Sequence, residues 1–445
     1  MSTNLPPAKS DEPEAEPLIV PRTLGEGAKQ AVAEQQKIPL SRILSVLGPG
    51  LISGSADNDP AGITTYSVVG AQNGYSQNWL LLLSTPMLIV VQQMSARIGN
   101  VTKTDFATAL RVNYGATVST IAVFAVVIAN VLALGADLDM LAAVTGLVTG
   151  VNFIYFVVPF AAIMAFVAIF VDYRAFSRSL IWLGAIFFAY IVAALLARPD
   201  WGEVLRQTVI PRIDLSPAYL LGAVGLLGTT IQPSLFFWQT SGEIEERRGV
   251  QNISRTNLDI VGGMIWSNVI AFFILVTTGT VLFSHHADIK TAADAAKALE
   301  PFAGPYAMYL FAIGIMGAGL LGIPVLAAST AYSVAGLAGW RRSLARTARN
   351  APEFYLVLGG AFLVGVQFAI VGLDPIKLLF YSQVLAGLIA PILIFLLVKL
   401  TSSRKVMGDF VNSRLVSGIG WLAVILLVAA DSAMIYTIVT TGGSS

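Results

Sequence analysis

The chain has 445 residues, of which 56% are hydrophobic and only 12% charged, and its mean hydropathy is +0.74. A soluble domain carries about twice that charged fraction, so the composition predicts a polytopic protein embedded in a lipid bilayer. The net charge of +1 argues against a nucleic-acid partner. The absence of cysteine excludes disulfides, thiolate metal sites and cysteine nucleophiles. We expect a protein that is not an enzyme and has no cofactor.

Residues 1–41 differ in composition from the rest of the chain. Proline and glutamate alternate there, and no apolar core of a signal peptide is present. This stretch is therefore expected to be a disordered cytoplasmic tail. Residues 42–445 are expected to form one transmembrane transporter domain.

The remaining sequence contains eleven hydrophobic stretches that are candidate membrane spans. They cover about residues 43–74, 77–98, 116–147, 150–171, 176–197, 216–246, 256–283, 303–339, 354–372, 375–400 and 412–440. Placing the N-terminus in the cytoplasm puts most loop arginines and lysines inside, which satisfies the positive-inside rule. The odd number of spans then places the C-terminus outside. We expect a multi-pass protein of a bacterial inner (plasma) membrane.

The first stretch is interrupted by the polar sequence Asp57-Asn58-Asp59-Pro60-Ala61-Gly62. Neither half reaches the roughly 20 residues that a membrane helix needs. An opened backbone at this depth is tolerated only where it lines a cavity or is buried in protein. A charge there costs roughly 2.5–3.5 kcal/mol, so the interruption predicts an ion or substrate site. The alternative is a proline kink with buried, satisfied carboxylates.

The sixth stretch has a similar design, because a glycine-rich half leads into Thr229-Thr230-Ile231-Gln232-Pro233-Ser234. Interruptions in the first and sixth of eleven spans predict a five-plus-five inverted repeat, as in secondary transporters. The repeats would cover about 42–197 and 214–401, and an extra helix would cover about 411–440. The alternative is two unrelated proline kinks.

If the two interruptions meet, their polar groups are almost all oxygen donors. They are Asp57, Asn58, Asp59, Gln232, Ser234 and the carbonyls that Pro60 and Pro233 leave without an N–H partner. Such donors suit Mg²⁺, Ca²⁺ and Mn²⁺. An organic substrate would need an apolar pocket beside them, which Phe236, Phe237 and Trp238 could supply. The donor set favours a cation.

Three motifs resemble the NRAMP family of divalent-metal transporters over about residues 42–440. They are the stretch from Ser55 to Ile63, the Gln232-Pro233 break followed by Phe236-Phe237-Trp238-Gln239, and Tyr381-Ser382-Gln383-Val384-Leu385. More narrowly, the chain resembles the NRAMP-related magnesium transporter branch. The resemblance implies an all-α fold of the LeuT type, with about eleven transmembrane helices and the first and sixth broken.

The resemblance also implies a ligand set. Asp59 takes the place of the family's metal-binding aspartate, and the family's backbone ligands map to the carbonyls of Ala56 and Thr229. Gln383 matches the tenth-span glutamine that approaches the metal on closure. Asp57 is added from the residues themselves as a further candidate ligand.

Several positions depart from the family pattern. Ala61 and Gly62 replace its glycine and asparagine, while Gln232 and Ser234 replace its methionine and histidine. Each change removes a softer or a side-chain ligand. This favours a cation that retains several waters, which is how Mg²⁺ is usually bound.

The proton route that the family uses is also altered. Asp137 matches the first acid of the third span, but Met140 stands where a glutamate is expected, with Asp139 shifted by one position. The ninth span has no arginine. We therefore expect uptake without proton coupling, driven by the membrane potential at about 2.3 kcal/mol per charge per 100 mV.

Several polar residues allow more than one interpretation. Gln232 is a ligand or an amide that caps the broken helix. Asp57 is a ligand, a partner of a ligand or, as we expect, a vestibule charge, and Asn58 is expected to cap the second half-helix. Gln383 is a gate ligand or an interhelical hydrogen-bond partner.

Other polar residues are expected to be structural. Asn130, Asp137 and Asp139 are expected to form a polar seam between helices, and the run from Glu243 to Arg248 is expected to be a solvated helix end. Asp259 and Asp431 have no partner that the sequence identifies.

The favoured function is a secondary transporter of Mg²⁺ and Mn²⁺ that works by alternating access, as a monomer. The alternatives are a proton-coupled Mn²⁺/Fe²⁺ importer and a Na⁺-coupled carrier of organic solutes. A membrane-embedded enzyme that uses Asp57 and Asp59 as a carboxylate pair is disfavoured. Such pairs draw one acid from each of two helices, whereas these two lie on one segment.

Overall fold

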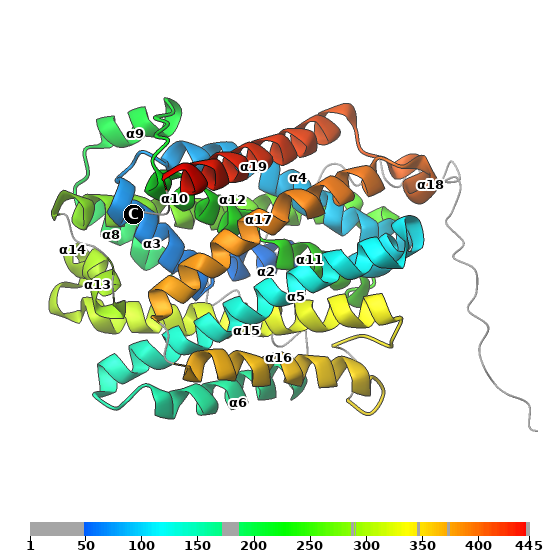
Figure 1. Cartoon of the computed structure of the whole chain (residues 1–445), viewed down its shortest axis with the longest axis horizontal. Coiled ribbons are helices and arrows are strands. Elements are labelled where there is room, and N and C mark those ends of the chain that lie inside the picture. Colours follow the sequence, from blue (N-terminus) through cyan, green and yellow to red (C-terminus); the bar gives the residue numbers. More distant parts are fainter. Residues whose placement is uncertain are drawn as a thin grey trace, which may run out of the picture.

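The computed structural model describes residues 49–170, 187–285, 289, 291–344, 348–371 and 374–441. The expected tail at 1–41 and half of the expected span at 176–197 lie outside these residues. The described part is built of helices, most of which run along one common direction (Figure 1).

Both interrupted spans form pairs of half-helices. The first consists of α2 (Pro49–Ala56) and α3 (Pro60–Asn73), and the second of α10 (Pro217–Thr230) and α11 (Pro233–Glu245). In each pair a proline occupies the first turn of the second half, where its missing N–H leaves no additional unpaired donor. The expected breaks are therefore present at both positions.

The other expected spans coincide with helices close to the expected positions. They are α4 (Asn78–Thr102), α5 (Phe106–Thr149), α6 (Ile154–Phe170), α8 (Phe188–Leu196), α12 (Ile253–Val281), α15 (Ala307–Ala338), α16 (Pro352–Ile370), α17 (Pro375–Thr401) and α19 (Arg414–Thr441). Shorter helices are α9 (Trp201–Val209), α13 (Ala292–Ala296), α14 (Glu300–Ala303) and α18 (Arg404–Met407). Eight of the described helices, with α10 and α11 counted together, are long and apolar enough to cross a membrane. The chain is a multi-pass membrane protein.

Helix α5 is longer than the expected third span because it contains a sharp break. Gly115 has φ 86°, a left-handed conformation that glycine adopts without a steric penalty. The apolar span therefore begins after Gly115, where the hydropathy places it, and a short helical segment precedes it.

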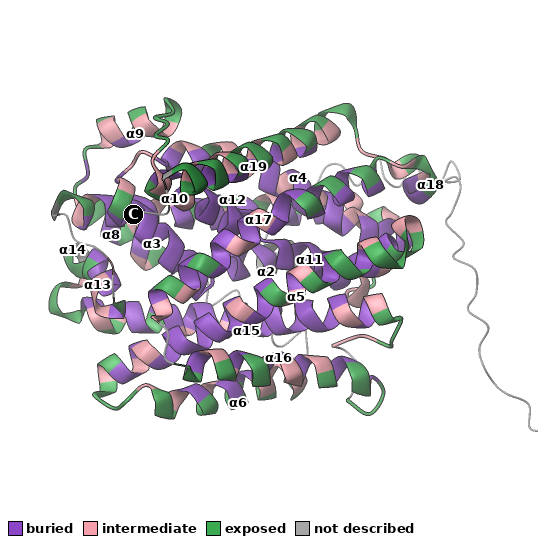
Figure 2. Cartoon of the chain, in the orientation of Figure 1, coloured by how far each residue is buried: buried purple, intermediate pink, exposed green. Residues whose placement is uncertain are grey.

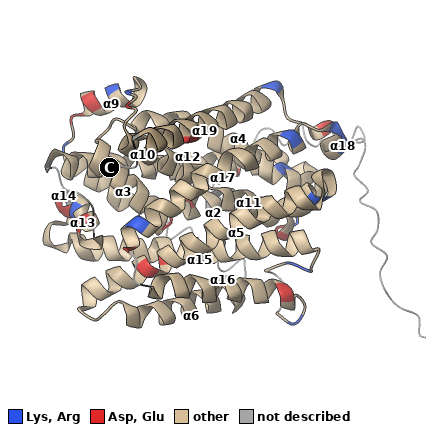
Figure 3. Cartoon of the chain, viewed as in Figure 1, with Lys and Arg blue, Asp and Glu red and all other residues tan. Residues whose placement is uncertain are grey.

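The four half-helices lie in the interior of the bundle. Figure 2 shows α3, α10 and α11 almost wholly buried, as are residues 53–56 of α2, whereas α6, α16 and α19 carry exposed residues along the outside. The exposed positions of the outer helices are largely apolar, as a lipid-facing surface requires. Charged residues are concentrated near the two ends of the helices, and lysine and arginine gather mainly at the end that carries α18 (Figure 3).

Glycines allow two close helix contacts that position the breaks. A Cβ atom on Gly54 of α2 would overlap the backbone of Gly263 on α12. A Cβ atom on Gly228 of α10 would overlap the backbone of Gln383 and Gly387 on α17. Small residues let helix backbones approach closely in membranes. As a result, α12 lies against the first break and α17 against the second.

Candidate metal site

Asp59 occupies the first break and caps the helix that follows it. Its side chain is 1% exposed, and Oδ1 accepts a hydrogen bond of 2.7 Å from the backbone N–H of Gly62. The expected cap, Asn58, does not perform this role. Its Nδ2 donates to Ser267 Oγ on α12 at 3.1 Å, so the expectation for Asn58 was wrong. Asp59 was the better-placed acceptor, because it directly precedes the first helical residue, Pro60.

Gln232 occupies the second break and points to the first. Its Nε2 donates to Asp59 Oδ2 at 3.4 Å, across 173 residues of sequence. Gln232 makes no side-chain capping hydrogen bond to α11, although it occupies the N-cap position. The two breaks therefore face each other, and the contact between them joins the two residues that the sequence singled out as ligands.

Each break also leaves one backbone carbonyl without its helical partner. The residue four positions after Ala56 is Pro60, and the residue four positions after Thr229 is Pro233. Proline has no N–H to donate, so neither carbonyl can receive the usual helical hydrogen bond. Ala56 and Thr229 are both buried beside the breaks. The structure places both expected backbone ligands at the site.

Further oxygen atoms converge beside Gly62. A Cβ atom on Gly62 would lie 2.8 Å from the carbonyl oxygen of Asp57, 3.1 Å from Thr229 Oγ1 and 3.3 Å from Asp59 Oδ1. Thr229 Oγ1 is buried and has no hydrogen-bond partner among the described residues. Oxygen atoms from both breaks thus share one small region that only glycine leaves open.

Gln383 of α17 lies next to the second break, since its carbonyl is against Gly228. Both polar atoms of its side chain are buried, and neither has a hydrogen-bond partner in the described part of the chain. The interhelical hydrogen bond that was one interpretation of Gln383 is therefore not formed. Its amide remains available to a ligand.

Asp57 does not lie in a vestibule, so that expectation was wrong. Its side chain is fully buried, and Oδ2 accepts a hydrogen bond of 2.5 Å from Ser267 Oγ. The carboxylate contacts α12 because the close approach of Gly54 to Gly263 brings the next turn of both helices together. Ser267 was not predicted from the sequence, because it is one of several hydroxyls in a mostly apolar helix.

Asp137 of α5 joins the first break. Its Oδ1 accepts a hydrogen bond of 3.1 Å from the backbone N–H of Ala61. Two carboxylates, Asp59 and Asp137, thus meet the N-terminus of α3, where the helix dipole favours negative charge. The expected polar seam holds for Asn130, which donates to Thr330 Oγ1 on α15 at 3.2 Å. Asp139 is buried, and neither of its carboxylate oxygens has a partner among the described residues.

Helix α15 closes the site from another side. A Cβ atom on Gly322 would lie 2.5 Å from Asp59 Cβ, so this glycine leaves the space that Asp59 occupies. Ser329 Oγ donates to the carbonyl oxygen of Ser234 at 2.6 Å. The Ser234 hydroxyl is itself buried without a partner in the described residues.

The donor set defines what the site can hold. No cluster of three or more Asp, Glu, His or Cys residues suited to a metal occurs within the described ranges. A cation at the breaks would meet carboxylate oxygen from Asp59, amide oxygen from Gln232 and backbone oxygen from Ala56 and Thr229. Such a site supplies few charged ligands, which suits a hard cation that keeps part of its water shell.

The two ends of the run from Glu243 to Arg248 are buried, the residues from Ile244 to Glu246 are half-buried and Arg247 is exposed. The expectation of a solvated helix end was therefore wrong for Glu243 and Arg248. Glu243 is fully buried and accepts hydrogen bonds from Asn100 Nδ2 at 3.1 Å and Thr256 Oγ1 at 3.0 Å. Arg248 lies 2.7 Å from Glu246, 3.3 Å from Asp259 and 3.8 Å from Glu243. We call these six residues the Glu243 network. It gives Asp259 the partner that the sequence did not identify.

The Glu243 network is connected to the first break. Gln239 Nε2 donates to Glu243 Oε1 at 2.9 Å, and Ser53 Oγ of α2 donates to Gln239 Oε1 at 2.6 Å. At the margin of the network, burial raises the pKa of Glu246 although Arg248 opposes the shift. Burial also lowers the pKa of Lys103, whose Nζ donates to the Arg248 carbonyl.

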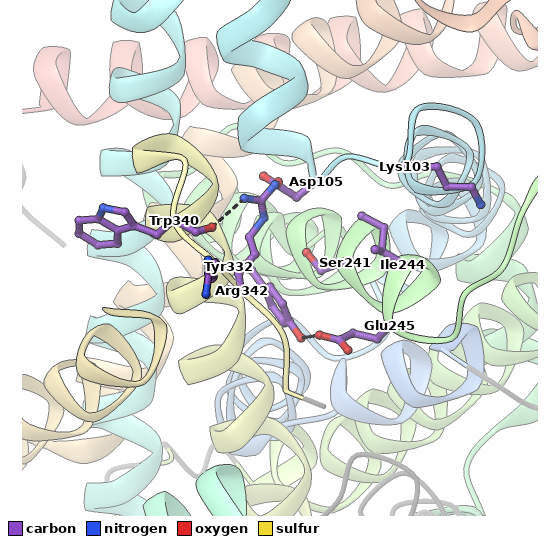
Figure 4. A pocket seen from close by; sticks show the side chains of 9 residues that line it. Lys103, Asp105, Ser241, Ile244, Glu245, Tyr332, Trp340 and Arg342 are labelled. Carbon is purple, nitrogen blue, oxygen red and sulfur yellow. Dashed lines mark hydrogen bonds and ion pairs between the residues drawn. The ribbon is translucent and has the colours of Figure 1, made fainter. Parts of the chain in front are cut away.

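The same end of α11 borders a cavity of about 230 Å³ between α5, α11 and α15. Figure 4 shows Glu245 and Tyr332 side by side in this cavity, where Tyr332 Oη donates to Glu245 Oε1 at 2.6 Å. Arg342 and Asp105, which also line the cavity, form an ion pair with each other. The acids that line the cavity are therefore already paired.

Asp431 of α19 is 7% exposed, and its Oδ1 has no partner among the described residues.

Comparison with known proteins agrees with this geometry. Residues 50–437 match the Nramp family, described as natural resistance-associated macrophage protein-like. A crystal structure of the Eremococcus coleocola manganese transporter, in complex with an aromatic bis-isothiourea substituted compound, has 18% sequence identity. Its TM-score is 0.74, and the alignment covers 92% of this chain and 91% of that one.

Two further structures define the fold. A variant of the same Eremococcus coleocola transporter has 20% identity and a TM-score of 0.76, covering 92% of this chain and 91% of that one. MhsT in complex with L-phenylalanine has 13% identity and a TM-score of 0.61, covering 88% and 97%. The all-helical fold with two broken helices is therefore of the LeuT type. Because the family match extends over most of the sequence, the chain belongs to the Nramp family.

Proposed function

We propose that the protein transports divalent metal cations across the membrane, with Mg²⁺ and Mn²⁺ as substrates. The contact between Gln232 and Asp59 carries this proposal, because it joins two helix breaks and directs a carboxylate and an amide to one point. Intramembrane acids are costly and commonly mark an ion pathway. The similarity to structures of a manganese transporter supports the same class of substrate.

The donors at the breaks favour a hard cation. Asp59, Gln232 and the carbonyls of Ala56 and Thr229 all present oxygen, and neither a thioether nor an imidazole is among them. Mg²⁺ prefers oxygen and gives up its waters reluctantly, so a site with few protein ligands suits it. Mn²⁺ accepts the same ligands. In this proposal Gln383 approaches the ion when the site closes.

We also propose that transport proceeds by alternating access without a coupled proton. The N–H of Ala61 already occupies Asp137 Oδ1, and α16 contains no arginine. Ser234, a hydroxyl that does not titrate, stands where the family has a histidine. An inside-negative potential contributes about 2.3 kcal/mol per charge per 100 mV, which lets a divalent ion accumulate without a co-ion.

The proposed setting is a bacterial inner membrane with a cytoplasmic N-terminus. Lysine and arginine gather at the end of the bundle that carries α18, which supports a cytoplasmic position for that end (Figure 3). The proposal treats the single chain as the transporting unit, since one chain supplies both breaks.

Transport in liposomes tests the proposal. Purified protein is reconstituted, Mn²⁺ uptake is followed with an internal metal-sensitive dye, and Mg²⁺ is added outside as a competitor. Mg²⁺ is expected to reduce Mn²⁺ uptake in a concentration-dependent manner. Asp59→Ala is expected to abolish uptake, because the carboxylate that contacts Gln232 is removed.

Asp431→Asn is the matched control, since Asp431 is also a buried intramembrane acid but lies on α19. Its uptake is expected to equal that of the wild type. Uptake that survives in Asp59→Ala would refute the site. Mn²⁺ uptake that is unaffected by millimolar Mg²⁺ would refute the choice of substrates.

A further inference from the structure

The first break presents two separate sets of oxygen atoms, directed to different helices. Asp59 is engaged by Gly62 and Gln232, whereas Asp57 and Asn58 both contact Ser267 of α12. The proposed divalent site uses the first set. The second set lies at the interface of α2 and α12 and has no role in that site.

This second set contains buried oxygen atoms that nothing in the described chain satisfies. Asp57 Oδ1 and Asn58 Oδ1 have no hydrogen-bond partner among the described residues. Asp57, Asn58 and Ser267 are each 0% exposed. A buried polar atom without a partner carries the full cost of its lost hydration, so two such atoms on adjacent residues indicate a missing ligand.

The charge of the second set is also uncompensated. Within the described ranges, the ion pairs of lysine and arginine go to other acids, and none involves Asp57. The single hydrogen bond that Ser267 donates to Asp57 supplies only a partial positive charge. A carboxyl group in a low-dielectric interior keeps its charge only beside a counter-charge, and is otherwise neutralised by a proton.

We infer that Asp57, Asn58 and Ser267 form a second cation site, distinct from the divalent site, that takes one small monovalent cation such as Na⁺. One positive charge neutralises one carboxylate, whereas a divalent ion would leave an excess charge buried. Carboxylate, amide and hydroxyl oxygens are the ligands of a hard cation. The contact of Gly54 with Gly263, one turn away, holds α2 close to α12 beside these oxygen atoms.

A cation bound here would hold two elements together. Asp57 and Asn58 belong to the segment between α2 and α3, and Ser267 belongs to α12. Binding would therefore stabilise the packing of the broken first span against α12, with no direct contribution to divalent-ion coordination.

Thermal unfolding of the full-length protein in detergent tests the inference. The melting temperature is measured in NaCl and in choline chloride at equal ionic strength, and separately with MnCl₂. The wild type is expected to show a saturable increase in Tm with Na⁺, because a ligand that binds only the folded state stabilises it. Asp57→Asn is expected to lose the Na⁺ effect and keep the Mn²⁺ effect. Asp59→Asn is expected to show the opposite pattern.

Ser267→Ala provides a second test, because it changes no charged residue and does not depend on whether Asp57→Asn folds. It is expected to weaken Na⁺ binding about tenfold, as loss of a group that orients a ligand does. Ser95→Ala is its control, since Ser95 Oγ donates to the Val91 carbonyl of its own helix. Its Na⁺ response is expected to be unchanged.

The outcomes separate the two sites. No Na⁺ effect in the wild type, or stabilisation by lower pH in place of Na⁺, would overturn the second site. So would an equal loss of both ion effects in Asp57→Asn, which would indicate one shared site. A Na⁺ effect without a Mn²⁺ effect would refute the divalent proposal and leave the second site standing.

Discussion

Gln232 Nε2 lies 3.4 Å from Asp59 Oδ2, although the two residues are 173 positions apart in the chain. Each residue immediately precedes a proline that begins a half-helix. The contact therefore relates corresponding positions in the two halves of the fold. It brings the carboxylate of Asp59 and the amide of Gln232 together inside the bundle.

Replacing Gln232 tests how the amide affects selectivity. In Gln232→Met a thioether takes the place of an oxygen ligand, and soft sulfur favours Mn²⁺ over Mg²⁺. We expect Mg²⁺ to compete with Mn²⁺ uptake about tenfold less well, which corresponds to about 1.4 kcal/mol. Competition curves in liposomes measure this. Gln367→Met on the exposed face of α16 should leave the curve unchanged, and the same shift in both variants would contradict the assignment.

Gly322 tests the packing of Asp59. In Gly322→Ala the new methyl group would lie 2.5 Å from Asp59 Cβ, so Asp59 or α15 must move. Overpacking of this kind costs about 1–3 kcal/mol, and we expect both Tm and Mn²⁺ uptake to fall. Gly360→Ala on α16 is the matched control, because nothing lies within 4 Å of its Cβ position. Equal uptake in the two variants would show that α15 does not position Asp59.

Arg248 tests the Glu243 network. Arg248→Met removes the cation that lies between Glu243, Glu246 and Asp259. Removing one partner of a buried ion pair costs about 3–5 kcal/mol, so a large drop in Tm is expected. Arg206→Met removes the cation of an exposed pair with Glu203 on α9 and should change Tm little. A small effect in Arg248→Met would mean that water reaches the network.

Proton movement tests the driving force. During Mn²⁺ uptake we expect no acidification of the liposome interior, because Asp137 Oδ1 already accepts from the Ala61 N–H and α16 contains no arginine. An internal pH-sensitive dye such as pyranine measures this, with a potassium gradient and valinomycin setting the potential. Uptake that increases with an inside-negative potential and leaves internal pH constant is the expected result. Acidification in proportion to Mn²⁺ entry would instead support a proton-coupled importer.

The fold could be predicted from the sequence because its main features are local. Pro60 and Pro233 interrupt apolar runs beside polar residues, so the breaks follow from steric and hydrogen-bonding rules. The left-handed turn at Gly115 likewise coincides with the start of an apolar stretch. Asp59 and Gln232 were identified for the same reason, since each directly precedes one of these prolines.

Contacts between distant helices could not be predicted in this way. Ser267 meets Asp57 across 210 residues, and nothing around it in α12 marks it as a partner. Asp137 was identified as a polar position, but only the packing of α5 against α3 places it at Ala61. The run from Glu243 to Arg248 resembles a solvated helix end because charged residues usually are solvated there. Its ends, Glu243 and Arg248, are buried because the chain turns back and places Arg248 against Thr256 and Asp259 of α12.

The glycine contact between α10 and α17 restricts how the molecule can open and close. Gly228 and Gly387 bring two backbones into direct contact, because neither residue has a side chain to separate them. Rotation of one helix against the other would force main-chain atoms to collide, so the pair is expected to travel as a rigid unit. Any displacement that carries the Gln383 amide inward must also carry the carbonyl of Thr229 with it.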